Sequence, residues 1–171
     1  KIICSRDSFG FGARRITVST VGIVSNIQQL GLIGLPVGLA VSLHTADNRL
    51  RRQLVPSASR WSVEDIVSAA GEYARKTGRT VTFEYVLLAG INDSNTDANN
   101  LAQLLSSRKN FSAKVNVIPY NPVPEIDKLL PPSQKRIRAF VAALRSQAVR
   151  VTIRKEKGQE VSAACGYRHP H

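Results

Sequence analysis

Four polar side chains stand where hydrophobic segments of this sequence end, and their types suit ligand binding. Ser19, Ser42 and His44 close two such segments, and Asn121 follows a third. Hydroxyl and amide groups hydrogen-bond to polar ligands, and an imidazole can exchange a proton near neutral pH. Each residue also has a structural alternative. The serines could satisfy backbone groups, Asn121 could serve a turn, and a histidine at a strand end is more often structural than catalytic.

The two cysteines, Cys4 and Cys165, are the candidate nucleophiles. They are separated by most of the 171 residues, so they form neither a disulfide framework nor a zinc site, and free thiols suit a reducing compartment. No metal-binding residues are predicted. Without further context, a lone cysteine such as Cys165 is most often a small buried hydrophobic residue.

Strand and helix patterns alternate along the chain and must position these side chains. β-branched and apolar runs predict five strands, at residues 15–20, 39–44, 81–88, 114–118 and 149–153, the last at a sheet edge. Helical periodicity predicts helices or turns at residues 24–30, 63–77, 96–107 and 133–148. Glu84, an acid in the third strand, is expected to be buried and paired, with an arginine as one candidate partner.

This alternation indicates an α/β fold with right-handed crossovers and a parallel sheet. Five strands are too few for a closed eight-stranded barrel, so the residues alone leave a small doubly wound sheet or part of a barrel. In both architectures ligands bind beyond the carboxyl ends of the strands. With no internal linker, residues 1–171 are predicted to form a single domain.

The charge of the chain favours polyanionic partners. Lys and Arg number 24 against 12 Asp and Glu, which gives a net charge of +12 and attracts nucleic acid. A solvated surface without a ligand is the alternative. No membrane span or leader is visible, so no membrane partner is expected, and the predicted location is the cytoplasm or an organelle matrix or stroma. The lack of any Met predicts a fragment or a processed product.

Five motifs occur in order along nearly the whole chain. They are Ser-Thr-Val-Gly (19–22), Ser-Leu-His (42–44), Glu-Tyr-Val-Leu-Leu with Gly-Ile-Asn-Asp (84–88 and 90–93), Ile-Pro-Tyr-Asn-Pro (118–122) and Ala-Ala-Cys-Gly (163–166). In this register the sequence resembles the radical S-adenosylmethionine (SAM) methyltransferases of the RlmN and Cfr type, which act on adenine C2 of 23S rRNA. The resemblance implies a partial (βα) barrel with parallel strands, incomplete in this chain and formed by its C-terminal part.

The resemblance also implies a two-step methyl transfer. One SAM methylates the cysteine of the last motif, here Cys165. A second SAM, cleaved reductively at a [4Fe–4S] cluster, gives a 5′-deoxyadenosyl radical that takes hydrogen from the S-methyl group, whose carbon then adds to adenine C2. By position, the SAM-contacting residues of the family correspond to Ser19, Ser42, Leu43, His44 and Asn121.

Two motifs of the family are missing. The family binds its cluster through Cys-x3-Cys-x2-Cys and contacts SAM through Gly-Glu-Pro, and this chain has neither. Cluster ligation needs thiolates, and Cys4 does not match the family's second cysteine. The chain alone is therefore not expected to catalyse the reaction. Its expected partner is 23S rRNA, with tRNA as a further candidate. The cluster-bearing half is expected to be missing through truncation, through gene splitting or because another chain carries it, so a second chain with the cluster motif is one candidate partner.

A catalytically inactive RNA-binding or ribosome-associated protein derived from this fold is the alternative function. The two classes are distinguished by motif retention, because a protein under no chemical constraint has little reason to keep Cys165, His44 and Asn121 together. Retention favours the enzyme part.

Overall fold

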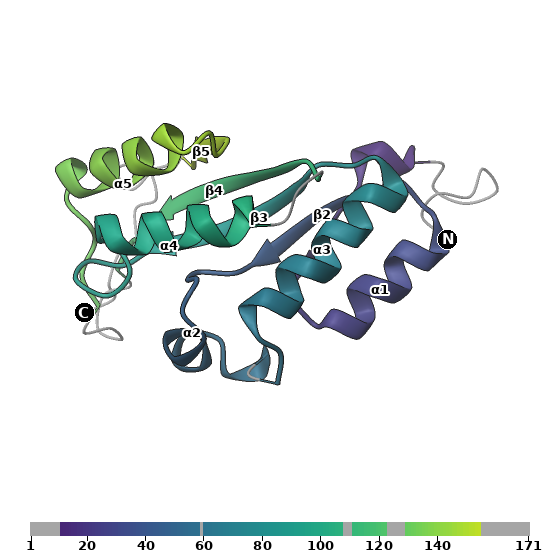
Figure 1. Ribbon diagram of the computed structural model, residues 1–171, viewed down its shortest axis with the longest axis horizontal. Coiled ribbons are helices and arrows are strands. Elements are labelled where there is room, and N and C mark those ends of the chain that lie inside the picture. Colours follow the sequence, from purple (N-terminus) through teal and green to yellow (C-terminus); the bar gives the residue numbers. More distant parts are fainter. Residues whose placement is uncertain (1–10, 59, 108–110, 123–128, 155–171) are drawn as a thin grey trace, which may run out of the picture.

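A computed structural model of the chain describes residues 11–58, 60–107, 111–122 and 129–154. These residues form one parallel sheet and a layer of helices (Figure 1). The strands are β1 (Thr17–Thr20), β2 (Gly38–Ser42), β3 (Val81–Leu87), β4 (Ala113–Pro119) and β5 (Val151–Ile153). The helices are α1 (Val24–Ile33), α2 (Asn48–Leu54), α3 (Val63–Thr77), α4 (Asn95–Ser106) and α5 (Gln134–Ser146), with short 3-10 turns at Ala13–Arg15 and Pro56–Ala58.

The strands lie in the sheet in their sequence order, β1-β2-β3-β4-β5, and each neighbouring pair is parallel. Right-handed crossovers between sequentially ordered strands bring every connecting helix to the same face. Figure 1 shows α1, α3, α4 and α5 on one side of the sheet. A doubly wound sheet would reverse its strand order and carry helices on both faces. The barrel-type arrangement is therefore the correct one, and among the described residues it is open, with β1 and β5 at its edges.

The core lies between the sheet and these helices. Side chains of β3 alternate, so that Val81, Phe83, Tyr85 and Leu87 are buried while the residues between them are half-buried. The Tyr85 ring lies 5.0 Å from the ring of Phe140 on α5, which identifies the buried face as the helix-covered one. Each fully buried apolar side chain contributes about 1.5–3 kcal/mol relative to exposure.

The helix ends follow from capping residues in the sequence. Ser62 and Asp65 form a reciprocal capping box at the start of α3, and Gly78, with φ of +66°, ends that helix. A second capping box, Ser94 with Asp97, begins α4 one residue earlier than the sequence pattern predicts.

Two expectations about elements are wrong. The sequence pattern gives no sign of α2, because its seven residues are mostly polar and lack an apolar stripe; its start is fixed instead by the Asp47 carboxylate, which accepts from the backbone N–H of Leu50 at 2.7 Å. Ala148 is expected on the last helix, but α5 ends at Ser146. Ala148 has φ of +60° and belongs to the turn that leads to β5.

Candidate functional site

The predicted ligand-binding residues lie at the carboxyl edge of the sheet, where all five parallel strands end. Ser19 is exposed near the end of β1, beside Ala40 of β2, and Ser42 is the half-buried last residue of β2. Asn121 is exposed two residues beyond the end of β4. Because β3 separates β2 from β4, Asn121 lies two strands away from Ser42 at the same edge.

A row of polar side chains continues from Ser42 across the face that the helices do not cover. Strand register sets Ser42 beside Glu84, Glu84 beside Asn116, and Asn116 beside Thr152. The Asn116 amide donates to the Glu84 carboxylate at 2.7 Å, and the Thr152 hydroxyl donates to the Asn116 carbonyl oxygen at 2.9 Å. Glu84 is thus half-buried and, among the described residues, paired with the Asn116 amide rather than with the arginine that was one candidate partner.

The segment after Ser42 turns away from regular strand geometry. The backbone N–H groups of Leu43 and His44 both donate to the Glu84 carbonyl oxygen, at 3.0 and 3.2 Å, and His44 has φ of +63°, a left-handed conformation that non-glycine residues rarely adopt. The Leu43 side chain is fully buried in the core. Only the backbone of Leu43 is therefore placed to meet a ligand.

His44 is held as a neutral imidazole. Its Nδ1 accepts the backbone N–H of Val86 at 3.1 Å, so the ring proton sits on Nε2. Burial, and then the positive charge of Arg51, lower the His44 pKa from 6.5 to about 4. Near pH 7 the ring is a weak base, which suits hydrogen bonding better than proton transfer.

Two buried polar residues at this edge escape the sequence interpretation. Arg51 on α2 is 2% exposed and Asn92 in the turn after β3 is 0% exposed. The Arg51 guanidinium donates to the carbonyl oxygens of Val21 and Ser42, and the Asn92 amide donates to the carbonyl oxygen of His44. Asn92 stands in the motif at 90–93, which was a usable signal. Arg51 gives none, because nothing in the sequence marks a buried arginine in a short polar helix.

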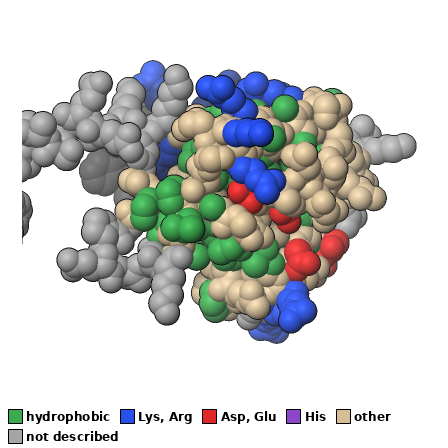
Figure 2. Space-filling model, turned by 90° about the vertical axis from the view of Figure 1, so that its left-hand side faces the viewer, with side chains coloured by type: hydrophobic (Ala, Val, Ile, Leu, Met, Phe, Trp, Pro, Cys, Tyr) green, Lys and Arg blue, Asp and Glu red, His purple; other side chains and the backbone are tan. Residues whose placement is uncertain are grey.

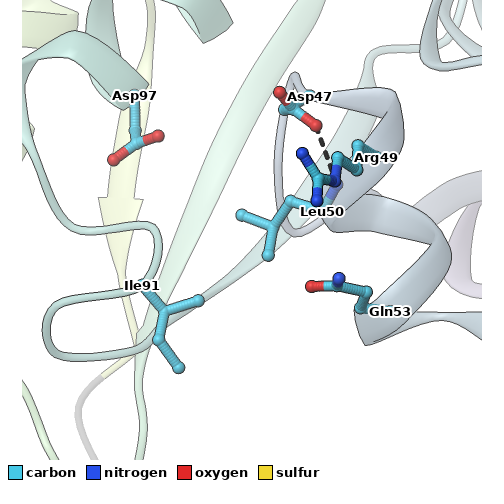
Figure 3. A pocket seen from close by; sticks show the side chains of 6 residues that line it. All are labelled: Asp47, Arg49, Leu50, Gln53, Ile91 and Asp97. Atoms are coloured by element: carbon cyan, nitrogen blue, oxygen red, sulfur yellow. Dashed lines mark hydrogen bonds between the residues drawn. The ribbon is translucent and has the colours of Figure 1, made fainter.

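Two hollows open near these residues. The larger, of about 430 Å³, lies between α2 and the loop after β3 (Figure 3) and is lined by Asp47, Arg49, Leu50, Gln53, Ile91 and Asp97. The smaller, of about 190 Å³, lies beside the edge strand β1 and is lined by Val18, Ser19, Thr20, Asn26, Ile27, Leu30 and Leu39. Acidic and basic side chains both line the larger hollow, so it offers hydrogen-bond acceptors and donors to a polar ligand.

The surface at the carboxyl ends of the strands combines apolar and basic side chains. Figure 2 shows this side, with hydrophobic side chains gathered in one patch and Lys and Arg above and below it. Ile91 and Leu130 are exposed in loops at this edge, where the N–H of Ala89 donates to the Leu130 carbonyl oxygen. Within the described ranges a single ion pair occurs, Arg136 Nε to Asp93 Oδ2 at 4.0 Å.

The cysteines cannot be placed in this geometry. Cys4 and Cys165 both lie outside the described residues. In the part of the chain that is described, no group of three or more His, Cys, Asp or Glu side chains could hold a metal ion. None of the described helices has the length and apolar character that a membrane crossing requires.

Known proteins of similar sequence are RNA methyltransferases. No family model matches the chain. The chain is 48% identical over 166 residues to the ribosomal RNA large subunit methyltransferase N of Nitrosopumilus maritimus, covering 97% of this chain and 46% of that protein. It is 43% identical to the probable dual-specificity RNA methyltransferase RlmN of Symbiobacterium thermophilum, covering 97% and 44%. The chain thus spans less than half the length of these curated relatives.

Solved structures of similar fold include a radical SAM methyltransferase. A radical SAM methyltransferase from Sphaerobacter thermophilus superposes with a TM-score of 0.85 at 43% identity, over 96% of this chain and 47% of that one. A domain of a pyruvate-formate lyase-activating enzyme from Bacteroides vulgatus has a TM-score of 0.63 at 15% identity and shares the fold alone. The resemblance and the partial barrel of the radical SAM type, both inferred from the motifs, are confirmed.

Proposed function

We propose that this chain, which matches RNA methyltransferases of the RlmN type along nearly all of its length, is the part of such a radical SAM enzyme that holds SAM and carries a methyl group to adenine C2 of 23S rRNA. In this proposal residues 1–171 form one domain, the C-terminal part of the barrel. The observation that carries it is the carboxyl edge of the sheet, where a rigid Ser42–His44 segment meets a polar row on the uncovered face.

The residues at this edge fit SAM. The molecule combines an amino acid group, ribose hydroxyls and an adenine, and each needs hydrogen-bonding partners when water is removed. Hydroxyls of Ser19 and Ser42, the backbone of Leu43, the Nε2–H of His44 and the amide of Asn121 provide them. SAM supplies the methyl group when it is bound. The role of this chain is to orient SAM and to exclude water from one side of the SAM molecule.

Cys165 is the proposed methyl carrier. With SAM bound, the Cys165 thiolate would accept the methyl group as a thioether, and the sulfonium sulfur of SAM would leave with the bonding electron pair. A thiolate is the nucleophilic form of cysteine, and only a sulfur can carry the methyl group as a thioether. A thioether carrier matters because adenine C2 is not nucleophilic.

The donor set of this chain does not fit a [4Fe–4S] cluster. Such clusters are held by cysteine thiolates, three of which come from the family's Cys-x3-Cys-x2-Cys motif, whereas this sequence has two cysteines far apart. The ligands must come from residues outside this chain, and a second polypeptide that carries the motif is the partner we propose. The open edge and uncovered face of the sheet support such an addition.

RNA is the proposed substrate. The net charge of +12 and the scarcity of ion pairs among the described residues support binding to a phosphate backbone. The Nitrosopumilus relative is named for ribosomal RNA and the Symbiobacterium relative as dual-specificity. We infer 23S rRNA as the first substrate and tRNA as a second to be tested.

The function is tested by combining this chain with a protein that carries the cluster motif, SAM, a reductant and a 23S rRNA fragment. We expect 2-methyladenosine in the RNA and, by mass spectrometry, a methyl group on the peptide that contains Cys165. Cys165→Ala should abolish both signals, because the carrier sulfur is gone. Cys4→Ala is the matched control and should leave them unchanged. Methylated RNA with Cys165→Ala would reject the carrier role.

A further inference from the structure

Arg51 is a charged residue whose side chain is buried away from water. Its side chain is 2% exposed at the carboxyl edge, and burial lowers its pKa. A buried charge is costly unless hydrogen bonds replace its water. One nitrogen, Nη2, donates to the carbonyl oxygens of Val21 at 2.5 Å and of Ser42 at 3.2 Å. Arg51 Nη2 thus contacts the backbone of two separate segments.

These two carbonyls belong to the ends of neighbouring strands. Val21 follows the last residue of β1, and Ser42 is the last residue of β2. The ladder between the two strands ends with Thr20 beside Val41, so the guanidinium joins the strands just beyond their last paired residues. Gly22 lets it approach. A Cβ at Gly22, where φ is +95°, would lie 3.1 Å from Arg51 Nη2 and 2.9 Å from Ile66 Cδ1.

Asn92 holds the segment formed by residues 42–44 from the side of β3. Its amide nitrogen donates to the carbonyl oxygens of His44 and Val86, both at 2.8 Å, and its side-chain oxygen accepts the N–H of Leu88 at 2.7 Å. The Tyr85 hydroxyl donates to its backbone carbonyl oxygen at 2.8 Å. Both amide hydrogens are thus used, and one of them fixes His44.

We propose that Arg51 and Asn92 are positioning residues that hold the 42–44 backbone from both sides and so set the geometry with which Ser42 and His44 meet SAM. The inference rests on the proposed function, since it assigns that segment to SAM. Groups held in place before a ligand arrives bind it without an ordering cost at that moment. Neither residue belongs to the set predicted to contact SAM.

The test compares variants of this chain in two measurements. SAM affinity is measured by calorimetry, and the imidazole of His44 is observed by NMR through its ring nitrogens, with the melting temperature recorded for each variant. Arg51→Gln removes the charge and the second donor group. Arg51→Lys keeps the charge but has no planar fork. Arg52→Gln is the matched control, because Arg52 is the next residue on α2 and is exposed. Asn92→Ala repeats the test from the other side.

We expect Arg51→Gln and Asn92→Ala to weaken SAM binding about tenfold or more, a loss of about 1.4 kcal/mol, and to shift the His44 ring signals. Arg51→Lys should fall between them and the unaltered chain, and Arg52→Gln should change neither quantity. Unchanged affinity and unchanged His44 signals in folded Arg51→Gln protein would overturn the proposal, even if the melting temperature falls.

The outcome also separates this inference from the proposed function. If the unaltered chain does not bind SAM, the SAM assignment fails for this chain, and positioning is judged by the His44 signals alone: shifted signals support it and unchanged signals overturn it. If Arg51→Gln does not fold, the SAM affinity and the His44 signals of Arg51→Lys are judged by the same criteria. If neither folds, Arg51 is a determinant of folding and the positioning role is rejected.

Discussion

Individual polar residues at the carboxyl edge are held by the backbone of neighbouring strands. His44 illustrates this, since its ring accepts an N–H of β3 and its carbonyl oxygen accepts from Asn92. Its left-handed backbone angle costs free energy on the order of 1–3 kcal/mol, which these hydrogen bonds offset. Rigid placement at such a cost is typical of binding sites, whereas a purely structural histidine does not require it.

The buried imidazole of His44 makes the stability of the protein depend on pH. The folded-state pKa is about 4 and the ordinary value is 6.5, so the unfolded chain takes up the proton first as the pH falls. The stability from the neutral ring is present above pH 6.5 and is lost between pH 6.5 and 4. We expect a loss on the order of 2–3 kcal/mol across this range, measured by urea unfolding at a series of pH values.

His44→Gln is the control for this pH effect, because glutamine does not titrate. Carboxylates that titrate in the same range contribute equally to both proteins, so the difference between their stability profiles isolates His44. Parallel profiles between pH 6.5 and 4 would contradict the neutral buried ring.

Between elements, the polar row Glu84–Asn116–Thr152 links β3, β4 and β5 on the uncovered face. Parallel strands are already joined by backbone hydrogen bonds, and this row adds side-chain bonds where the sheet has no helix above it. A central Asn can serve both neighbours because its amide group donates on one side and accepts on the other. The row therefore fixes the polar surface that extends from Ser42.

Asn116→Ala should destabilise the protein by about 1–3 kcal/mol, because half-buried Glu84 loses its donor and Thr152 loses its acceptor. The midpoint of urea unfolding measures this loss. Asn99→Ala is the matched control, since the side-chain oxygen of Asn99, like that of Asn116, accepts a side-chain hydrogen bond, here from the Gln147 amide at 2.7 Å, but Asn99 and Gln147 are both exposed. That variant should change stability by less than about 0.5 kcal/mol. Equal losses would show that the row does not contribute as a partly buried network.

On the scale of the whole molecule, the two dominant features are the positive net charge and the face of the sheet that the described helices leave uncovered. The net charge of +12 is spread along the sequence, and among the described residues the helices cover one face of the sheet. A basic protein with an exposed polar sheet face suits a large anionic partner on one side and a second protein segment at its edge. Both features agree with the RNA substrate and the second polypeptide that we propose for this chain.

Binding to 23S rRNA fragments should weaken steeply with salt, because Lys and Arg contacts release counterions from the RNA. We expect affinity to fall about 10³-fold between 50 and 200 mM salt, as for about six phosphate contacts. Filter binding or fluorescence anisotropy over this range measures the slope. A flat response would argue against a basic RNA surface.

Anaerobic incubation of this chain with iron and sulfide should leave it colourless, since two cysteines distant in sequence cannot supply three thiolate ligands. Absorption spectroscopy after desalting is the measurement. The same treatment of a protein with the Cys-x3-Cys-x2-Cys motif is the positive control. A [4Fe–4S] spectrum on this chain would show that our assignment of the cluster to another polypeptide is wrong.

Sequence patterns alone were enough to predict the strands, most helices and the resemblance to radical SAM methyltransferases. They also predicted that Ser19, Ser42, His44 and Asn121 lie at the carboxyl edge of the sheet. These features depend on local periodicity, capping residues such as Ser62 and Gly78, and motifs at strand ends, all of which act over a few neighbouring residues. Local signals of this kind are legible without knowledge of packing.

The choice between a doubly wound sheet and a barrel required the three-dimensional fold, because it depends on strand order, which local patterns do not encode. The fold also replaced the candidate arginine partner of Glu84 with Asn116 and revealed the roles of Arg51 and Asn92. These contacts join residues 9 to 48 positions apart. Such pairings are set by how strands and loops meet in space, so the sequence pattern cannot specify them.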